Sequence, residues 1–65
     1  MLYFYYAQAE YTSESGVIEV PSRLEKEKDF EDVRKRIYDK IASLYPDFPR
    51  DEIPKEFIIE AFYPL

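Results

Sequence analysis

Carboxylates are the most abundant side chains of catalytic or metal-binding type, since fourteen of the 65 residues are Asp or Glu. Hydrolysis of a glycosidic bond uses two carboxyl groups about 5–9 Å apart in a cleft. Nothing in the pattern distinguishes Glu10 and Glu60 from ordinary surface acids, and so short a chain has little room for a cleft. Asp47, Asp51 and Glu52 could contact a hard cation, but they lack the spacing of a calcium-binding loop. These acids therefore predict neither a hydrolase nor a metal site.

Other catalytic groups are scarce. The chain has no His and no Cys, so it lacks the usual zinc ligands and the usual base for a serine nucleophile. The serines concerned are Ser13, Ser15, Ser22 and Ser43. A single glycine cannot form a glycine-rich phosphate loop. We therefore expect a protein that is not an enzyme, holds no metal or cofactor and has no small-molecule substrate.

The charge pattern argues against direct binding of nucleic acid. The net charge is −5, and residues 1–22 carry three acids and no base. A negative surface repels phosphates. The densest positive cluster is Arg34-Lys35-Arg36. On a helix these three side chains spread over about 300°, because each residue advances by about 100°. The cluster predicts a solvated, salt-bridged surface rather than a phosphate site.

The first eleven residues are the most distinctive stretch, because four consecutive aromatics, Tyr3 to Tyr6, precede the first charge at Glu10. Successive side chains of a strand point to opposite faces, so this run places large rings on both. In a domain this small only one face can pack against a helix. The other face is expected to present Phe4 and Tyr6 to water or to a partner.

Three segments are predicted as strands, residues 2–11, 17–20 and 56–63. Small polar residues at 12–16 predict the turn of a hairpin, in which Gly16, the only glycine, would take a positive φ. Pro21 ends the second strand, and Pro64 ends the third.

The main helix is predicted from Asp29, a good N-cap, to the residue before Pro46. Apolar residues recur there at three- and four-residue intervals and form one stripe, namely Phe30, Val33, Ile37, Ile41 and Leu44. A charged linker over 22–28 precedes the helix. A proline-rich loop over 46–54 follows it, and we expect Phe48 and Ile53 to pack that loop onto the domain.

These elements predict one α+β domain over residues 1–65. Its sheet has three antiparallel strands, connected strand-strand-helix-strand, and one helix packs on one face. The first strand is the least charged and belongs in the middle, so the strand order is 2-1-3. The helix then links the two outer strands.

Alternation along the strands predicts which side chains face the helix. Ala7 and Ala9 allow a close approach, so the first strand turns its odd-numbered residues inward. In the third strand the inward set is Phe57, Ile59, Ala61 and Tyr63. The outer face then carries six apolar residues, which we predict as the partner-binding surface: Leu2, Phe4, Tyr6, Val17, Ile58 and Phe62. Gln8, Glu10, Glu19 and Glu60 would surround them, which is the apolar centre and polar rim typical of protein interfaces.

Two alternatives exist for this face. The loop over 46–54 could fold under the sheet and cover it as a second small core. Single-stranded nucleic acid could stack on its rings, as on other aromatic sheets, but the acidic rim opposes that interaction.

Three segments carry a resemblance to a group of proteins. They are the tyrosine-rich strand from Tyr3 to Tyr11, the Val20-Pro21-Ser22-Arg23 exit and the helix start Asp29-Phe30-Glu31-Asp32-Val33. With this layout the chain resembles small uncharacterised accessory proteins of phages and prophages. The resemblance covers about half of the chain and carries no diagnostic motif. It implies an accessory role and transfers no residue roles.

The sequence therefore predicts a non-enzymatic protein–protein interaction module, a homodimer or a partner of another protein. The alternative is a small acidic inhibitor that occupies a basic site on a nucleic-acid-processing enzyme. No apolar run reaches the roughly 20 residues that a membrane span needs, and no basic leader precedes the apolar start. We therefore expect a cytoplasmic protein that does not bind membranes.

Overall fold

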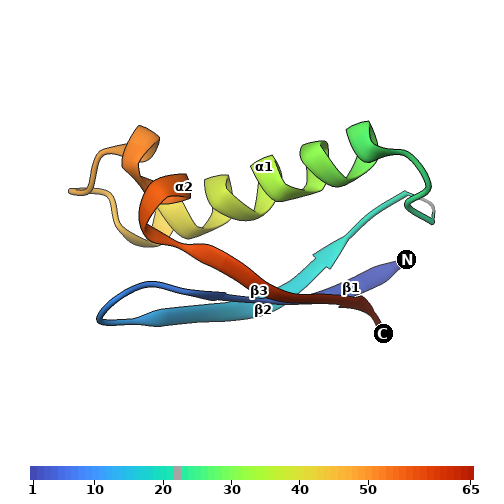
Figure 1. The fold of residues 1–65 in the computed structure, drawn as a ribbon, viewed down its shortest axis with the longest axis horizontal. Helices are drawn as coiled ribbons and strands as arrows, with labels where there is room; N and C mark the ends of the chain where they lie inside the picture. The colour runs from blue at the N-terminus through green and yellow to red at the C-terminus, as the bar shows by residue number, and fades with distance from the viewer. Residues whose placement is uncertain (22) are drawn as a thin grey trace.

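The computed structural model describes residues 1–21 and 23–65 and has the predicted α+β architecture. The elements follow in the order β1 (Leu2–Gln8), β2 (Ser13–Glu19), α1 (Glu27–Leu44), the 3-10 turn η1 (Arg50–Glu52), α2 (Ile53–Glu56) and β3 (Ile58–Pro64). Both neighbours of β1 run antiparallel to it, in the order β2-β1-β3, which confirms the predicted topology. The helices lie on one side of the sheet (Figure 1). Within the predicted linker over 22–28, Ser22 lies outside the described residues.

The hairpin between β1 and β2 differs from the prediction. The β2 strand begins at Ser13, four residues earlier than expected, and the connection is residues 9–12. The Ala9 amide donates to the Thr12 carbonyl at 2.8 Å and closes this short loop. Gly16 does not adopt a positive φ, so its predicted role in the turn is wrong. The longer ladder pairs backbone groups that a turn over 12–16 would have left without partners.

Gly16 instead makes room for an aromatic ring. It lies within β2, directly opposite Tyr5 of β1. A methyl group on Gly16 would lie 2.9 Å from Tyr5 Oη and 3.1 Å from Cζ. Tyr5 is only 2% exposed, so its ring has little freedom to move away. The glycine is therefore required by the close approach of the ring and not by backbone conformation.

We expect Gly16→Ala to lower the free energy of unfolding by about 1–2 kcal/mol. Overpacking costs about 1–3 kcal/mol, and the lower entropy of the unfolded alanine chain offsets part of that cost. Urea denaturation of Gly16→Ala in two backgrounds, wild type and Tyr5→Phe, measures the effect. The cost should be smaller in Tyr5→Phe, which lacks the closest atom. An equal cost in both backgrounds would contradict the proposed clash.

The start of α1 also differs from the prediction, because the helix begins at Glu27 and its N-cap residue is Lys26. Asp29 occupies the third helical position. From there its carboxylate accepts a hydrogen bond from the Lys26 amide at 3.2 Å, which satisfies a donor at the helix start. The helix ends at Leu44, before Pro46, as predicted.

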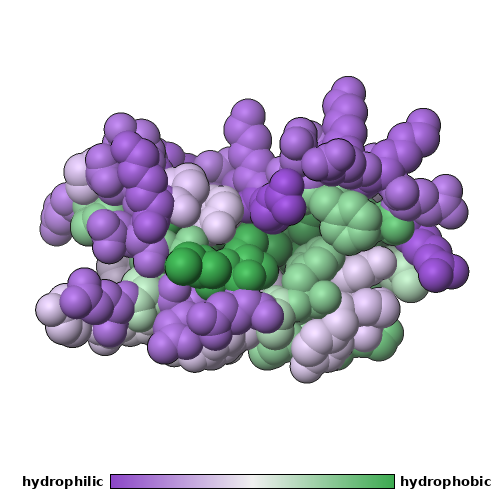
Figure 2. Space-filling view, in the orientation of Figure 1, coloured by the Kyte–Doolittle hydropathy of each residue, from purple (hydrophilic) through white to green (hydrophobic). Residues whose placement is uncertain are grey.

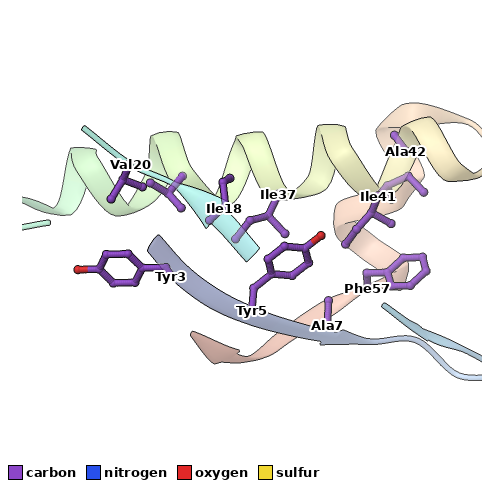
Figure 3. Packing of buried hydrophobic residues seen from close by; sticks show 11 residues of the cluster. Tyr3, Tyr5, Ala7, Ile18, Val20, Ile37, Ile41, Ala42 and Phe57 are labelled. Atoms are coloured by element: carbon purple, nitrogen blue, oxygen red, sulfur yellow. The ribbon is translucent and has the colours of Figure 1, made fainter. Parts of the chain in front are cut away.

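The core lies between α1 and the sheet (Figure 3). Val33, Ile37 and Ile41 are buried, as their spacing predicts. Leu44 is 59% exposed, so its predicted place in the buried stripe is wrong. The stripe continues instead through Ala42 and the half-buried Tyr45, whose ring lies 5.7 Å from that of Phe57. Among the described residues, the buried hydrophobic cluster consists of Tyr3, Tyr5, Ala7, Ile18, Val20, Val33, Ile37, Ile41, Ala42, Ile53 and Phe57.

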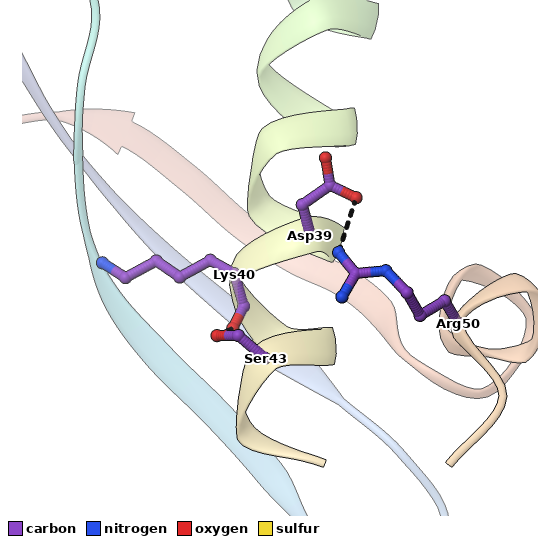
Figure 4. A network of polar contacts seen from close by, with 4 residues as sticks. All are labelled: Asp39, Lys40, Ser43 and Arg50. Carbon is purple, nitrogen blue, oxygen red and sulfur yellow. Dashed lines mark hydrogen bonds and ion pairs between the residues drawn. The ribbon is translucent and has the colours of Figure 1, made fainter. Parts of the chain in front are cut away.

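The segment between α1 and β3 packs beside α1, on the helix side of the sheet (Figure 1). Ile53 is buried in the core, as predicted, whereas Phe48 remains partly exposed. An ion pair between Asp39 of α1 and Arg50 of η1, 3.5 Å apart, links the two elements (Figure 4). Both side chains are largely exposed, so this pair adds little stability. The alternative in which residues 46–54 cover the outer face is therefore wrong.

Candidate functional site

The outer face of the sheet is shaped by a β-bulge in β3. Tyr6 lies opposite Ala61, whereas the next residue of β1, Ala7, lies opposite Ile59. Glu60 therefore has no partner on β1. The bulge adds one residue to β3. Because successive side chains of a strand point to opposite faces, each side chain after the bulge lies on the face opposite to that expected for regular pairing.

The bulge reverses the predicted orientation at the end of β3. Phe62 faces the helix: its ring stacks on Tyr3 at a centroid distance of 4.7 Å and meets the edge of Phe30 at 6.4 Å. The prediction that Phe62 belongs to the outer surface is therefore wrong. Ala61 and Tyr63, predicted to face inward, lie opposite Tyr6 and Phe4 on the outer face. Before the bulge, Phe57, Ile58 and Ile59 have the predicted orientation.

The corrected surface is called the outer sheet patch and consists of Leu2, Phe4, Tyr6, Val17, Ile58 and Tyr63. Phe4 is at its centre, because Val17 of β2 and Tyr63 of β3 lie directly opposite it on either side. The rings of Phe4 and Tyr63 are 5.2 Å apart. Leu2, Val17, Ile58 and Tyr63 are exposed, and Phe4 and Tyr6 are half-buried.

Polar residues lie at both ends of the patch. At one end, Glu19 lies opposite Leu2, and the Leu65 amide donates to the Leu2 carbonyl at 2.9 Å. At the other end, Ser15 lies beside Tyr6, and Ser13 lies beside Gln8. The predicted rim is therefore only partly formed, because Gln8 and Glu19 lie on this face whereas Glu10 lies in the hairpin loop and Glu60 in the bulge.

The charges are divided between the two layers. All nine Lys and Arg residues lie between residues 23 and 55, which span the helical layer and its connections, so the strands carry no base. Glu19, opposite Leu2, is the acid that β2 places on the outer face. The centre of the patch is consequently uncharged.

Two bases of α1 cover the free edge of β2. Arg36 Nη2 donates to the Glu19 carbonyl at 2.9 Å, and Lys40 Nζ donates to the Val17 carbonyl at 3.1 Å. Figure 4 shows Lys40 extending toward this strand. Occupied carbonyls and positive charge disfavour the addition of another strand at this edge. This edge of the sheet is therefore protected, whereas no helix covers the outer face among the described residues.

The basic cluster at 34–36 does not form one patch. Arg36 reaches β2, whereas Arg34 lines a groove between α1 and β3 together with Phe30 and Phe62. Figure 2 shows the hydrophobic band between the hydrophilic surface of α1 and the sheet. Among the described residues, the ion pairs join Asp39 to Arg50 and Glu52 to Lys55, so the predicted salt-bridged arrangement of this cluster is wrong.

A polar cluster lies where the end of α1 meets β2. The Tyr45 hydroxyl donates a hydrogen bond to the Glu14 carboxylate, and this bond raises the pKa of Tyr45 above its ordinary value. Burial, and secondarily the charge of Glu14, raises the pKa of Tyr5. Lys40 Nζ lies 5.7 Å from the centroid of the Tyr5 ring, within cation–π range. Both phenols are therefore held in the protonated form, which suits a structural cluster.

The other residues considered for chemistry lie apart. Ser13 and Ser15 are exposed on β2, and Ser43 donates to the Lys40 carbonyl at 2.6 Å. In the part of the chain that the structure describes, no three His, Cys, Asp or Glu side chains come together as metal ligands. The absence of enzymatic activity stays a prediction.

Comparison of the chain with protein-family models, curated proteins and solved structures found no match. The resemblance to phage accessory proteins therefore stays a prediction. Within residues 1–21 and 23–65, no helix has the length and apolar character required to cross a membrane.

Proposed function

We propose that this chain acts as a protein–protein interaction module that forms a homodimer through the outer sheet patch. The observation that carries the proposal is the Phe4–Tyr63 aromatic pair on a sheet face over which the described residues place no helix. Exposed Leu2, Val17 and Ile58 extend the apolar surface around this pair. Contiguous apolar patches of this kind mark interaction sites on soluble proteins.

The chemistry of the patch suits a second copy of the same chain. A twofold dimer brings the same surface together from both subunits, so that surface must be complementary to itself. An uncharged centre meets this requirement without placing like charges in contact. Two sheets can pack face to face about 10 Å apart with interdigitated side chains. A domain of 65 residues is marginally stable alone, and burial of this face would add apolar contacts.

The test is the solution mass of the wild type and of Phe4→Asp, measured by light scattering behind size exclusion over a hundredfold range of concentration. We expect a dimer for the wild type and a monomer for Phe4→Asp, because the substitution places a carboxylate at the centre of the interface. The matched control is Tyr11→Asp, which adds the same charge at a highly exposed aromatic position in the hairpin loop. It should remain dimeric.

Circular dichroism establishes whether Phe4→Asp keeps its helix. A folded Phe4→Asp protein with the wild-type mass would show that the proposed surface is wrong. A monomeric wild type would exclude the homodimer and leave the patch for a different protein.

Salt separates this proposal from the inhibitor alternative. An apolar dimer should persist at 1 M salt, whereas a complex with a basic enzyme site should weaken because the Debye length falls to about 3 Å.

A further inference from the structure

A cavity lies between the hairpin loop, the residues that follow α1, and α2. Figure 1 shows these segments at one end of the molecule. The volume of the cavity is about 190 Å³. Four aromatic residues are among those that line it, Tyr11, Tyr45, Phe48 and Phe57. The carboxylate-bearing residues Glu10 and Glu56 also line it, and no Lys or Arg contributes to the wall among the described residues. The cavity is thus mainly apolar, with aromatic residues in its lining and two exposed acidic residues beside it.

These walls have the chemistry that recognises an organic cation. The face of an aromatic ring is electron-rich and attracts a cation within about 6 Å of its centroid, and several rings together form the cages that bind quaternary ammonium groups. Carboxylates beside the rings add attraction for positive charge and repel anions. A neutral apolar ligand would gain nothing from Glu10 and Glu56.

Two rings of the cage are held in place by the fold. The rings of Tyr45 and Phe57 are 5.7 Å apart and tilted by 43°, and the buried Phe57 supports the Tyr45 ring from the core. The Tyr45 hydroxyl donates to the Glu14 carboxylate, which holds the ring and polarises it toward greater electron density. Phe48 and Tyr11 are more exposed and lie at the entrance of the cavity.

The neighbouring bases are engaged by other carboxylates. Lys55 of α2 pairs with Glu52 at 3.6 Å, and Arg50 of η1 pairs with Asp39 at 3.5 Å. Neither base lines the cavity. No Lys or Arg among the described lining residues therefore neutralises the charges of Glu10 and Glu56.

We propose that this cavity binds an alkylammonium group, through the accessible aromatic residues Tyr45 and Phe48 and the nearby charges of Glu10 and Glu56. The group could be a free quaternary amine or the methylated lysine side chain of a partner protein, because both present the same chemistry. The site is separate from the outer sheet patch, so it does not depend on the proposed homodimer.

The test is a proton NMR titration of the chain with choline at constant ionic strength. We expect binding in the millimolar range, upfield shifts of the N-methyl resonance from the ring currents, and shifts of the Tyr and Phe ring protons. The neutral isostere of choline, in which a tert-butyl group replaces trimethylammonium, should bind at least several-fold more weakly. A short peptide that carries trimethyllysine is titrated in parallel to distinguish a protein ligand from a free amine.

Variants assign the binding to the cage. Phe48→Leu keeps apolar volume but removes a ring face, and we expect it to weaken choline binding roughly threefold to tenfold. The matched control is Phe30→Leu, a ring of nearly equal exposure (38% against 39%) at the other end of α1, which should bind as the wild type does. Glu56→Gln should weaken binding of choline and leave binding of the neutral isostere unchanged.

Three results would overturn the proposal. The first is equal affinity for choline and its neutral isostere. The second is no loss of affinity in folded Phe48→Leu. The third is that neither choline nor the trimethyllysine peptide binds. Binding of only one of these two ligands would support the proposed site and would show whether its ligand is a free amine or a methylated lysine of a protein. The Phe4→Asp variant should bind choline like the wild type, so a failure of the homodimer would not be mistaken for a failure of this site.

Discussion

Replacement of Ile41 with alanine is expected to lower the free energy of unfolding by about 2–5 kcal/mol, the range observed for buried Ile and Leu. Ile41 has no exposed surface and lies in the middle of the core between α1 and the sheet. A domain of 65 residues has a total stability of roughly 3–10 kcal/mol, at about 0.05–0.15 kcal/mol per residue. The substitution therefore removes a large fraction of the total, and at the upper end it unfolds the protein.

The control for this experiment is Leu44→Ala on the same helix. Leu44 is largely exposed, so the same kind of truncation should change stability by less than about 0.5 kcal/mol. Urea denaturation followed by circular dichroism measures both variants. Similar losses at the two positions would contradict the observed burial and would favour the original stripe, in which both residues face the sheet.

Adjacent substitutions in β3 should have opposite consequences. Phe62→Ala removes a half-buried ring that contacts Tyr3 and Phe30, and we expect it to destabilise the fold by roughly 2–3 kcal/mol, somewhat less than a fully buried ring. Tyr63→Ala removes the partner of Phe4 on the outer face. It should leave the monomer folded and weaken the proposed dimer at least tenfold, as expected of an aromatic at the centre of an interface.

The two effects must be measured separately, because dimerisation itself would raise the apparent stability. Denaturation is therefore compared in the Phe4→Asp background, and dimer affinity is compared in the otherwise wild-type chain. If Tyr63→Ala destabilised the Phe4→Asp monomer more than Phe62→Ala did, the bulge at Glu60 would be absent and the strand would alternate regularly.

The two proposed sites lie on different parts of the molecule. The outer sheet patch is on the sheet face opposite α1, whereas the aromatic cage lies between the hairpin loop and α2, on the helix side. A homodimer formed through the patch would therefore display two cages. Such an arrangement would favour ligands with more than one ammonium group through effective concentration.

Much of the fold follows from local patterns. Apolar spacing in α1 predicts burial of Val33, Ile37 and Ile41, and the runs of aromatic and β-branched residues predict the strands. The lack of charge in β1 predicts its central position, and hence the order β2-β1-β3. These features are determined by the sequence because helix and strand periodicities depend on residues close together in the chain.

Other features depend on contacts between distant segments. The bulge at Glu60 is a matter of pairing between β1 and β3, and nothing in the local alternation of β3 reveals it. Gly16 is required by the ring of Tyr5, eleven positions earlier, rather than by a turn. Tyr45 replaces Leu44 in the buried stripe because Phe57 provides a ring to pack against.

The predicted contact surface and the proposed ammonium site also depend partly on local sequence and partly on long-range contacts. The aromatic character of one sheet face follows from the sequence, since four consecutive rings must occupy both sides of a strand. The presence of Tyr63 rather than Phe62 on that face, and the meeting of residues 10–11 with residues 45–57 around one cavity, follow from the folded arrangement. Strand register and loop packing depend on long-range contacts, whereas a local pattern specifies only which side chains alternate.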